Sequence, residues 1–210
     1  MAKRLSRHIS GDIRFDRFDL ARYATDASPF QVFPLGVVVP KTQDDIKAAV
    51  TIANEAGVPV TARGGGSGLS GQAIGEGLIL DFSKYLTRML FCDTQAMTCV
   101  VEPGITLAAL NTALNSKSLW FPIDIGSAHQ ATIGGMAGTD AIGVRALQYG
   151  RMRDNIVAVD AILADGSEVS FGEIGEEFGL DAQRDASSLL ILDLLEIVEG
   201  NEAAVAALRL

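Results

Sequence analysis

One segment constrains this chain more than any other: the glycine-rich stretch Arg63-Gly64-Gly65-Gly66-Ser67-Gly68-Leu69-Ser70-Gly71. It directly follows the apolar run Val58-Pro59-Val60-Thr61-Ala62, which is typical of a strand. Glycine lets the backbone adopt positive φ and come close to a ligand. Consecutive free N–H groups in such a turn form a concavity that binds anions, and Arg63 and the two serines add donors. The segment therefore predicts a cradle for a phosphate or pyrophosphate.

The letters of this segment allow more than one interpretation. Residues 66–71 spell G-x-G-x-x-G, but a Rossmann site for NAD also needs a helix directly after the loop. Here residues 72–77 carry two more glycines and lead into another apolar run, which argues against NAD. A P-loop needs Gly-Lys-Ser/Thr, and no lysine lies near. When this loop is taken alone, a glycine-rich hairpin without a ligand stays open as an alternative.

Strands and helices alternate along the first 172 residues. Thr42 is expected to cap a helix, with Asp45 at the capping-box position, and Gly57 is expected to stop that helix. Thr106 begins a second helix with leucines on one face. Asp165-Gly166 predicts a hairpin turn. The expected strands are residues 36–39, 58–62, 78–82, 88–92, 97–101, 155–163 and 167–171.

The pattern predicts an α+β protein made of two small α+β subdomains, residues 35–101 and 102–172. We expect residues 1–34 to form an irregular N-terminal arm with one short helix. Residues 173–210 begin acidic and end rich in Leu, Ala and Glu. We therefore expect an acidic loop and a helical C-terminal tail there.

A second glycine-rich stretch, Thr132-Ile133-Gly134-Gly135-Met136-Ala137-Gly138, follows roughly sixty residues after the first. Asp124 and Ser127 precede it. Two such loops in consecutive α+β units could hold a dinucleotide between them. Thr132 could equally be a plain helix N-cap, with Gly134-Gly135 as a site of tight packing. Asp124 could equally be a solvated acid in a turn.

Charge and cysteine content exclude several function classes. The chain has 210 residues, of which 48% are hydrophobic and 20% charged, enough for a sizeable core. Its net charge of −9 argues against nucleic acid, because phosphate backbones need basic surface. Cys92 and Cys99 form no C-x-x-C, and the only histidines are His8 and His129. We expect no metal or iron–sulfur site, no transmembrane segment, and a cytoplasmic protein with two reduced thiols.

Four motifs follow one another in the order of the chain. They are Pro34-Leu35-Gly36-Val37-Val38-Val39-Pro40 with the helix after it, the loop Arg63–Gln72, Ala131-Thr132-Ile133-Gly134-Gly135-Met136-Ala137-Gly138, and Tyr149-Gly150 followed by Arg153-Asp154-Asn155-Ile156-Val157 and Ala164-Asp165-Gly166. This ordered set, far more specific than any single loop, resembles the N-terminal FAD-binding part of the FAD-linked oxidase family, also called the vanillyl-alcohol oxidase or p-cresol methylhydroxylase (PCMH) type. The resemblance covers roughly residues 24–172 and is strongest to the D-lactate and glycolate dehydrogenase branch.

The resemblance implies a FAD-binding PCMH-type domain with a role for each motif. Backbone N–H groups of Gly64 to Gly68, with the Ser67 hydroxyl, would hold the FAD pyrophosphate. Ser70, Gly71 and Gln72 would continue along the cofactor, and Pro122, Asp124 and Ser127 would line its far side. Thr132 to Gly135 and Gly138 to Ala141 would lie near its ribityl and isoalloxazine portion. Ile156 or Val157 would meet the adenine end through backbone contacts. The expected cofactor-binding residues are Arg63, Gly64, Gly65, Gly66, Ser67, Gly68, Ser70, Gly71, Gln72, Pro122, Asp124, Ser127, Thr132, Ile133, Gly134, Gly135, Gly138, Thr139, Ala141, Ile156 and Val157.

Two positions decide how the cofactor is held. Relatives with covalent flavin often carry a histidine after the loop glycines, where this chain has Ser67, so the resemblance implies non-covalent FAD. The family often has Asn after the second glycine stretch, where this chain has Thr139-Asp140-Ala141-Ile142. Asp140 would bring a negative charge close to an electron-rich cofactor, unless it points away or pairs with Arg145 or Arg151.

Relatives continue with segments that do not occur here. These are a third cofactor segment of the type Gly-Ser-Glu-Gly-Thr-Leu-Gly and a substrate-capping domain with the substrate-binding arginine and the catalytic base. We therefore expect a piece of a longer protein, with an exposed apolar face toward the missing part.

The expected function is that of the FAD-binding domain of a flavin-dependent 2-hydroxy-acid dehydrogenase or oxidase of the D-lactate or glycolate type, inactive alone. No catalytic residue is assigned, and His129 is expected to have a structural or surface role. The alternative is a non-catalytic piece or subunit that docks a partner chain and does not retain FAD. The exposed face is expected to stay uncovered unless the helices at residues 186–209, a second copy or a partner chain covers it.

Overall fold

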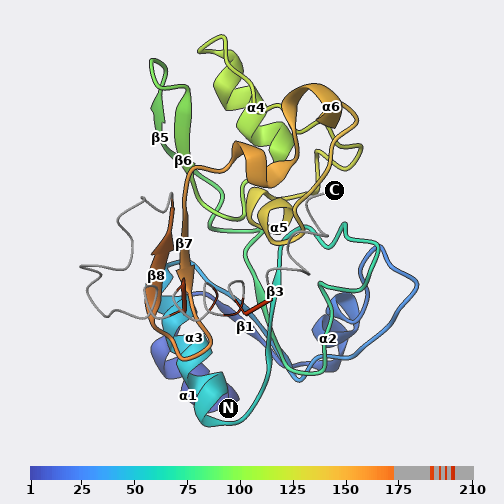
Figure 1. Ribbon diagram of the computed structural model, residues 1–210. Coiled ribbons are helices and arrows are strands. Elements are labelled where there is room, and N and C mark those ends of the chain that lie inside the picture. Colours follow the sequence, from blue (N-terminus) through green and yellow to red (C-terminus); the bar gives the residue numbers. More distant parts are fainter. Residues whose placement is uncertain (173–189, 192–193, 195–196, 198–199, 202–210) are drawn as a thin grey trace, which may run out of the picture. The chain divides into compact units, whose positions relative to one another are not determined.

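The computed structural model describes residues 1–172, 190–191, 194, 197 and 200–201 (Figure 1). Residues 1–156 with 164–166 form one compact unit, and residues 157–163 with 167–210 form a second. The predicted acidic loop and helical tail therefore lie almost wholly outside the described residues.

A four-stranded sheet with the strand order β1-β2-β4-β3 organises the first half of the larger unit. Strand β4 lies between β2 and β3 and is parallel to both, whereas β1 is antiparallel to β2. Every residue of β2 and β4 is buried, which explains why both are nearly continuous apolar runs. The strands are β1 (Asp12–Arg14), β2 (Gly36–Val39), β3 (Val60–Arg63) and β4 (Leu78–Asp81).

Helix α3 (Gln43–Glu55) connects β2 to β3. As predicted, the Thr42 side chain caps it by accepting a hydrogen bond from the Asp45 N–H at 3.1 Å. The Asp45 carboxylate is 3% exposed and accepts hydrogen bonds from the backbone N–H groups of Ser10, Gly11 and Lys41. Among the described residues the Asp45 carboxylate does not accept from the Thr42 N–H, so the predicted capping box is not formed. The carboxylate instead joins the chain just before β1 to the start of α3.

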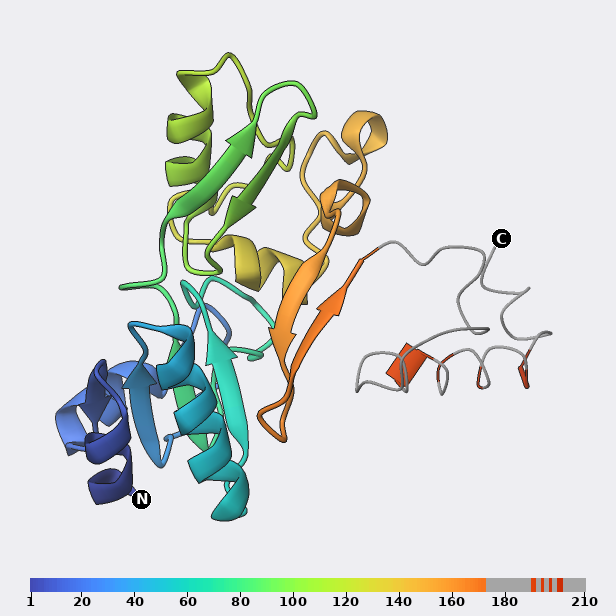
Figure 2. The ribbon, with the colours of Figure 1, turned by 90° about the vertical axis from the view of Figure 1, so that its left-hand side faces the viewer.

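The first 34 residues are more ordered than the predicted irregular arm. They contain α1 (Ala2–His8), β1 and α2 (Arg17–Tyr23). Helix α1 lies beside α3 (Figure 2). Arg4 of α1 forms an ion pair with Glu55 of α3. The prediction was wrong because these short elements depend on partners that are distant in the sequence.

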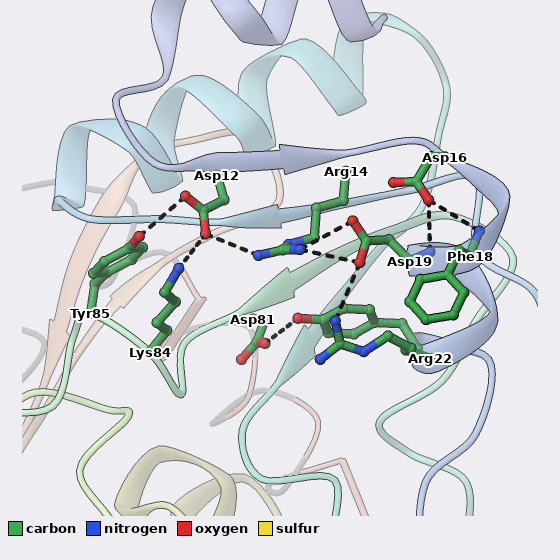
Figure 3. A network of polar contacts seen from close by, with 10 residues as sticks. Asp12, Arg14, Asp16, Phe18, Asp19, Arg22, Asp81, Lys84 and Tyr85 are labelled. Atoms are coloured by element: carbon green, nitrogen blue, oxygen red, sulfur yellow. Dashed lines mark hydrogen bonds and ion pairs between the residues drawn. The ribbon is translucent and has the colours of Figure 1, made fainter.

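A polar network fastens β1 and α2 to the chain around the end of β4 (Figure 3). The Arg14 guanidinium donates to Asp19 and to Asp12, both at 3.1 Å. Asp12 also accepts from the Lys84 ammonium at 2.6 Å and from the Tyr85 hydroxyl at 3.1 Å. A further bond joins α2 to β4, because the Tyr23 hydroxyl donates to Asp81 at 2.7 Å. The pKa of Tyr23 is raised, first by burial and then by this hydrogen bond.

The second half of the larger unit holds the β5–β6 hairpin and four short helices. Cys92 lies directly opposite Cys99 in the hairpin, and both are free thiols. Thr106 caps α4 as predicted, and Leu107, Leu110 and Leu114 are buried. None of the helices in the described part of the chain is long and apolar enough to cross a membrane. The elements are β5 (Met89–Asp93), β6 (Thr98–Val101), α4 (Leu107–Asn115), α5 (Ile133–Gly138), α6 (Ala146–Tyr149) and the 3₁₀ helix η1 (Met152–Asn155).

The described part of the smaller unit contains an antiparallel hairpin of β7 (Val159–Ile162) and β8 (Glu168–Phe171). This confirms the predicted hairpin, but the first strand starts later than the predicted residue 155. The reason is local. The Asn155 side chain donates to the carbonyls of Tyr149 and Arg151, and such side-chain bonds to the backbone favour a turn over a strand.

Candidate functional site

The glycine-rich loop leaves the carboxyl end of β3 and returns to the start of β4. The two strands are parallel neighbours, yet residues 64–77 between them contain no helix. This confirms the strand–loop–strand arrangement that argued against a Rossmann NAD site. In open sheets with parallel strands, ligands bind outside the carboxyl ends of the strands. The loop occupies that position.

The two glycine stretches touch each other. A Cβ atom on Gly64 would lie 2.1 Å from the Thr132 hydroxyl, and one on Gly65 would lie 1.9 Å from the Gln130 carbonyl oxygen. No side chain fits at such distances, so Gly64 is needed for close approach of the Thr132 side chain and Gly65 for close approach of the Gln130 backbone. The contact brings the predicted loops at 63–72 and 132–135 to one place.

The loop carries a row of backbone donors without acceptors. In the part of the chain that the structure describes, no residue accepts a hydrogen bond from the N–H groups of Gly64 to Leu69. The Ser67 hydroxyl likewise has no partner among the described residues. Gly66 has a φ of +64°, and a change of backbone handedness within a run of N–H groups produces an anion-binding concavity. This donor set fits a pyrophosphate.

The Arg63 side chain is bound to the backbone. Its guanidinium donates to the carbonyl oxygens of Thr25 at 2.9 Å, Ala73 at 3.2 Å and Tyr23 at 3.4 Å. It also lies over the Tyr23 ring, 5.3 Å from the ring centroid. A direct contact of Arg63 with a cofactor stays a prediction, whereas the structure shows this side chain holding the base of the loop.

The far end of the loop is closed by its own side chains. The Gln72 carbonyl oxygen accepts a hydrogen bond from the Ser70 N–H at 3.2 Å, and its amide lies against Gly68. Gly71 has a φ of +76°, and a Cβ there would lie 2.9 Å from the Phe30 ring. These contacts give the loop a defined shape before any ligand is considered.

In the second glycine stretch the backbone donors are used within the protein. Thr132, only 1% exposed, caps α5 by accepting from the Gly135 N–H at 3.2 Å. The N–H groups of Ile133 and Gly134 donate to the carbonyls of Ile105 and Pro103. A Cβ on Gly134 would lie 2.7 Å from the Pro103 side chain. The plain N-cap and the tight packing that the sequence left open are both present, and cofactor contacts of this stretch stay predictions.

The two acidic residues near the predicted site are paired with arginines. Asp124 lies 3.1 Å from the Arg145 guanidinium, so it is more than a solvated turn acid. Asp140, in a left-handed conformation with a φ of +45°, lies 3.2 Å from Arg151 and accepts from the Arg153 N–H at 3.0 Å. The charge of Asp140 is therefore balanced, which meets the condition under which the sequence allowed an acid here.

The remaining predicted residues support the second half of the larger unit. Ile133, Ala141 and Ile156 pack against a buried cluster that includes Ile123 and Met136. Two others make local hydrogen bonds: the Ser127 carbonyl accepts from the N–H groups of Gln130 and Ala131, and the Thr139 hydroxyl donates to the Gly135 carbonyl. Pro122 is half-buried. The space beside Gly138 is empty, because no atom lies within 4 Å of where its Cβ would be. Val157 belongs to the smaller unit and is exposed.

Sequence reasoning missed the residues of the N-terminal segment that hold the loop. The Ala27 N–H donates to the Gly66 carbonyl at 2.9 Å, and Tyr23 and Thr25 provide carbonyls for Arg63. Gln130 was also missed, although its carbonyl contacts Gly65. Apart from the Tyr23 ring beneath the Arg63 guanidinium, these contacts are made by backbone atoms, so the side-chain types carry little signal.

Comparison with known families finds a match to the FAD binding domain over residues 34–172, which is well over half of the chain. The match begins just before β2 and ends with the β7–β8 hairpin.

Curated relatives of the whole chain include three enzymes. It is 31% identical to the D-2-hydroxyglutarate dehydrogenase of Haemophilus influenzae over 97% of this chain and 19% of that protein. It is 36% identical to the D-lactate dehydrogenase of Archaeoglobus fulgidus, covering 87% of this chain and 41% of that one. It is 34% identical to the glycolate oxidase subunit GlcD of Bacillus subtilis, covering 78% of this chain and 36% of that one. The chain thus spans less than half the length of these relatives.

Solved structures share the fold. The 6-hydroxy-D-nicotine oxidase of Arthrobacter nicotinovorans superposes with a TM-score of 0.72 at 20% identity, covering 82% of this chain and 37% of that one. An alkyldihydroxyacetonephosphate synthase superposes with a TM-score of 0.69 at 20% identity, covering 78% and 32%. At these identities the likeness shows the fold alone.

Proposed function

The chain belongs to the FAD binding domain family, and from this premise we propose that the loop at residues 63–72 holds the FAD pyrophosphate without a covalent bond. The single observation that carries the proposal is the row of N–H groups from Gly64 to Leu69 without acceptors in the described part of the chain. These local donors attract a doubly charged diphosphate, although the net charge of the whole chain is −9. Ser67, in place of a histidine, offers no imidazole nitrogen for a flavin linkage at this position.

We further propose that the complete enzyme oxidises a small 2-hydroxy acid. Three relatives with this type of substrate in their names, over 78% or more of this chain, support the proposal. When bound, FAD would supply the hydride acceptor, which takes a hydride from the α-carbon of such an acid. The described residues contribute binding and orientation: the loop holds the diphosphate, and the arginine partners of Asp124 and Asp140 balance the acidic charge. By itself, this chain is proposed to bind FAD without turnover.

The proposal is tested on the purified 210-residue chain. We expect FAD titration to give saturable quenching of flavin fluorescence, and acid precipitation to release all of the flavin into the supernatant. D-lactate, glycolate and D-2-hydroxyglutarate should leave the bound flavin oxidised under anaerobic conditions. Absence of FAD binding would contradict the binding role, flavin that stays with the precipitate would contradict the non-covalent mode, and bleaching by a hydroxy acid would contradict inactivity.

A second candidate function is docking of another protein surface. Three apolar side chains close together in sequence stand exposed around the start of α6, namely Ile142 at 57%, Val144 at 85% and Leu147 fully. Exposed apolar groups of this kind favour association. Analytical ultracentrifugation of the chain checks this, because self-association that disappears in Leu147→Asp would support an interface between copies, whereas a monomer at all concentrations would contradict one.

We also propose that the protein works in the cytoplasm. The free thiols of Cys92 and Cys99, directly opposite each other in a hairpin, support a reducing surrounding. Fractionation of the source cells, followed by detection of the chain in the cytosolic fraction, is the measurement that checks this.

A further inference from the structure

The Arg63 guanidinium is occupied by backbone carbonyls around the glycine loop. Three of its N–H bonds point to the carbonyls of Tyr23, Thr25 and Ala73, at 2.9 to 3.4 Å. Its Nη2 atom lies 2.7 Å from where a Cβ on Gly66 would stand. The rigid fork of five donors in arginine can span several carbonyls at once, which the single ammonium of a lysine cannot do.

The N-terminal segment fixes the orientation of the loop through one further bond. The Ala27 N–H donates to the Gly66 carbonyl at 2.9 Å. In a planar trans peptide, the carbonyl of one residue and the N–H of the next point in opposite directions. Because the Gly66 carbonyl points toward Ala27, the Ser67 N–H points away from the N-terminal segment. This bond therefore aims one of the donors that the proposed site needs.

We propose that Arg63 is a positioning residue. Together with residues 23–27 it holds the loop at residues 63–72 in the shape in which its backbone N–H groups can bind the diphosphate, and the Arg63 side chain itself does not contact the diphosphate. This inference rests on the proposed function of the loop. It adds that the FAD site includes a part of the chain before residue 34, where the family match begins. Residues 23–27 bind the loop through two contacts: the Thr25 carbonyl accepts from the Arg63 guanidinium, and the Ala27 N–H donates to the Gly66 carbonyl.

A direct role and a positioning role predict different behaviour of the protein without FAD. If Arg63 only paired with the diphosphate, the free protein would not depend on its fork. If Arg63 positions the loop, replacing it loosens residues 23–28 and 63–72 before any ligand is added. Hydrogen–deuterium exchange of these two segments in the FAD-free chain separates the two cases.

The test compares the full chain with Arg63→Lys, Ala27→Pro and the control Arg22→Lys. Arg63→Lys keeps the charge but loses the fork, and Ala27→Pro removes the donor to Gly66 while Arg63 stays. Arg22 is an exposed arginine on α2 that forms an ion pair with Asp19 at 3.4 Å. Far-UV circular dichroism checks that each variant is folded, and if one is not, the other carries the test. FAD affinity is measured by fluorescence quenching.

We expect both variants to exchange faster than the parent at residues 23–28 and 63–72 without FAD, and to bind FAD at least roughly tenfold more weakly, which is the effect of losing one hydrogen bond to a charged group. Arg22→Lys should match the parent in both measurements. Unchanged exchange in folded Arg63→Lys would overturn the inference, whatever its FAD affinity. If the parent itself binds no FAD, the proposed function fails, while the exchange data still decide whether Arg63 and Ala27 hold the loop.

Discussion

At the scale of single residues, the glycines of the first loop have different reasons for being glycine. Gly66 and Gly71 have positive φ, whereas Gly64 and Gly65 have backbones pressed against Thr132 and the Gln130 carbonyl. The sequence shows only that all are glycine. Their separate roles follow from the contact between two loops that are distant in the chain.

Gly65→Ala tests this contact. The added methyl would lie 1.9 Å from the Gln130 carbonyl oxygen, so the two loops must move apart. We expect the free energy of unfolding to fall by about 1–3 kcal/mol, as for other overpacked sites, and FAD binding to weaken. Urea denaturation measures the first effect and flavin fluorescence the second.

Gly126→Ala is the matched control, because no atom lies within 4 Å of its Cβ position and its φ is not positive. It should change neither quantity appreciably. Equal behaviour of the two variants would show that the loops are not in contact in solution.

Asp45 makes the stability of the folded protein depend on pH, through its contacts with the chain before β1. Burial by itself would raise the pKa of this carboxyl, but the hydrogen bonds from Ser10, Lys41 and Gly11 together hold the pKa below its ordinary value. A lowered pKa in the folded state means that the carboxylate stabilises the fold at neutral pH, and that this contribution is lost as the pH falls through the folded pKa.

We therefore expect Asp45→Asn to lower the free energy of unfolding by about 1.5–3 kcal/mol at pH 7, the cost of losing hydrogen bonds to a charged group. The difference from the parent chain should shrink below about pH 4, where the unfolded carboxyl is protonated. Urea denaturation at pH 7 and at pH 3.5 measures it. A difference that is the same at both pH values would mean that the charge of Asp45 is not what stabilises this contact.

At the scale of elements, helix α5 shows how local rules and tertiary contacts meet. Thr132 caps it in the ordinary way, but the same hydroxyl lies at the position that a Cβ on Gly64 would need. The helix has six residues, three of them glycine, so its own propensity is poor. Its position depends on the cap and on the bonds from Ile133 and Gly134 to the chain before α4.

Thr132→Val is expected to destabilise the protein by about 1–2 kcal/mol, because the methyl that replaces the hydroxyl cannot accept from the Gly135 N–H. Thr132→Ser keeps the oxygen and should retain the cap. Thermal unfolding followed by circular dichroism compares the two. If Val and Ser are equally destabilising, the loss comes from packing and the cap contributes nothing.

Most elements were predictable where a local signal marks them. The caps at Thr42 and Thr106, the buried strands β2 and β4 and the Asp165-Gly166 hairpin all follow from side-chain chemistry within a few residues. Helices α1 and α2 and strand β1 were missed, because short elements of this kind are stable only against partners elsewhere in the chain. The late start of β7 has a different, local cause, since the Asn155 side chain bonds the nearby carbonyls of Tyr149 and Arg151.

At the scale of the larger unit, the N-terminal segment is structurally inseparable from the sheet. Strand β1 pairs with the buried strand β2, Leu5 of α1 is fully buried, and the Asp12–Arg14–Asp19 network binds Lys84 and Tyr85 after β4 (Figure 3). The family match starts only at residue 34, yet the part before it covers one edge of the sheet.

A chain shortened to residues 34–210 is expected to lose several kcal/mol of stability, because burial of Leu5 alone contributes about 1.5–3 kcal/mol and the backbone bonds of β1 are lost as well. The uncovered β2 edge should also cause aggregation. Urea denaturation and size-exclusion chromatography measure both effects, and adding a peptide of residues 10–33 should partly reverse the aggregation. A shortened chain that is monomeric and equally stable would show that the segment is dispensable.

The sequence by itself determined the nature of the site. The absence of a helix after the first glycine stretch and the absence of a nearby lysine argued against NAD and a P-loop, the resemblance of four ordered motifs to a known family implied FAD, and the family match agrees. Local chemistry suffices there, because a tight turn rich in free N–H groups is written in consecutive residues. Only the tertiary structure decided that Gly64 and Gly65 face residues 130–132, that Asp140 pairs with Arg151, and that Arg63 binds residues 23–25. Those contacts join backbones and charges far apart in the chain. Every residue type has a backbone carbonyl, so the sequence does not show which carbonyl accepts a hydrogen bond.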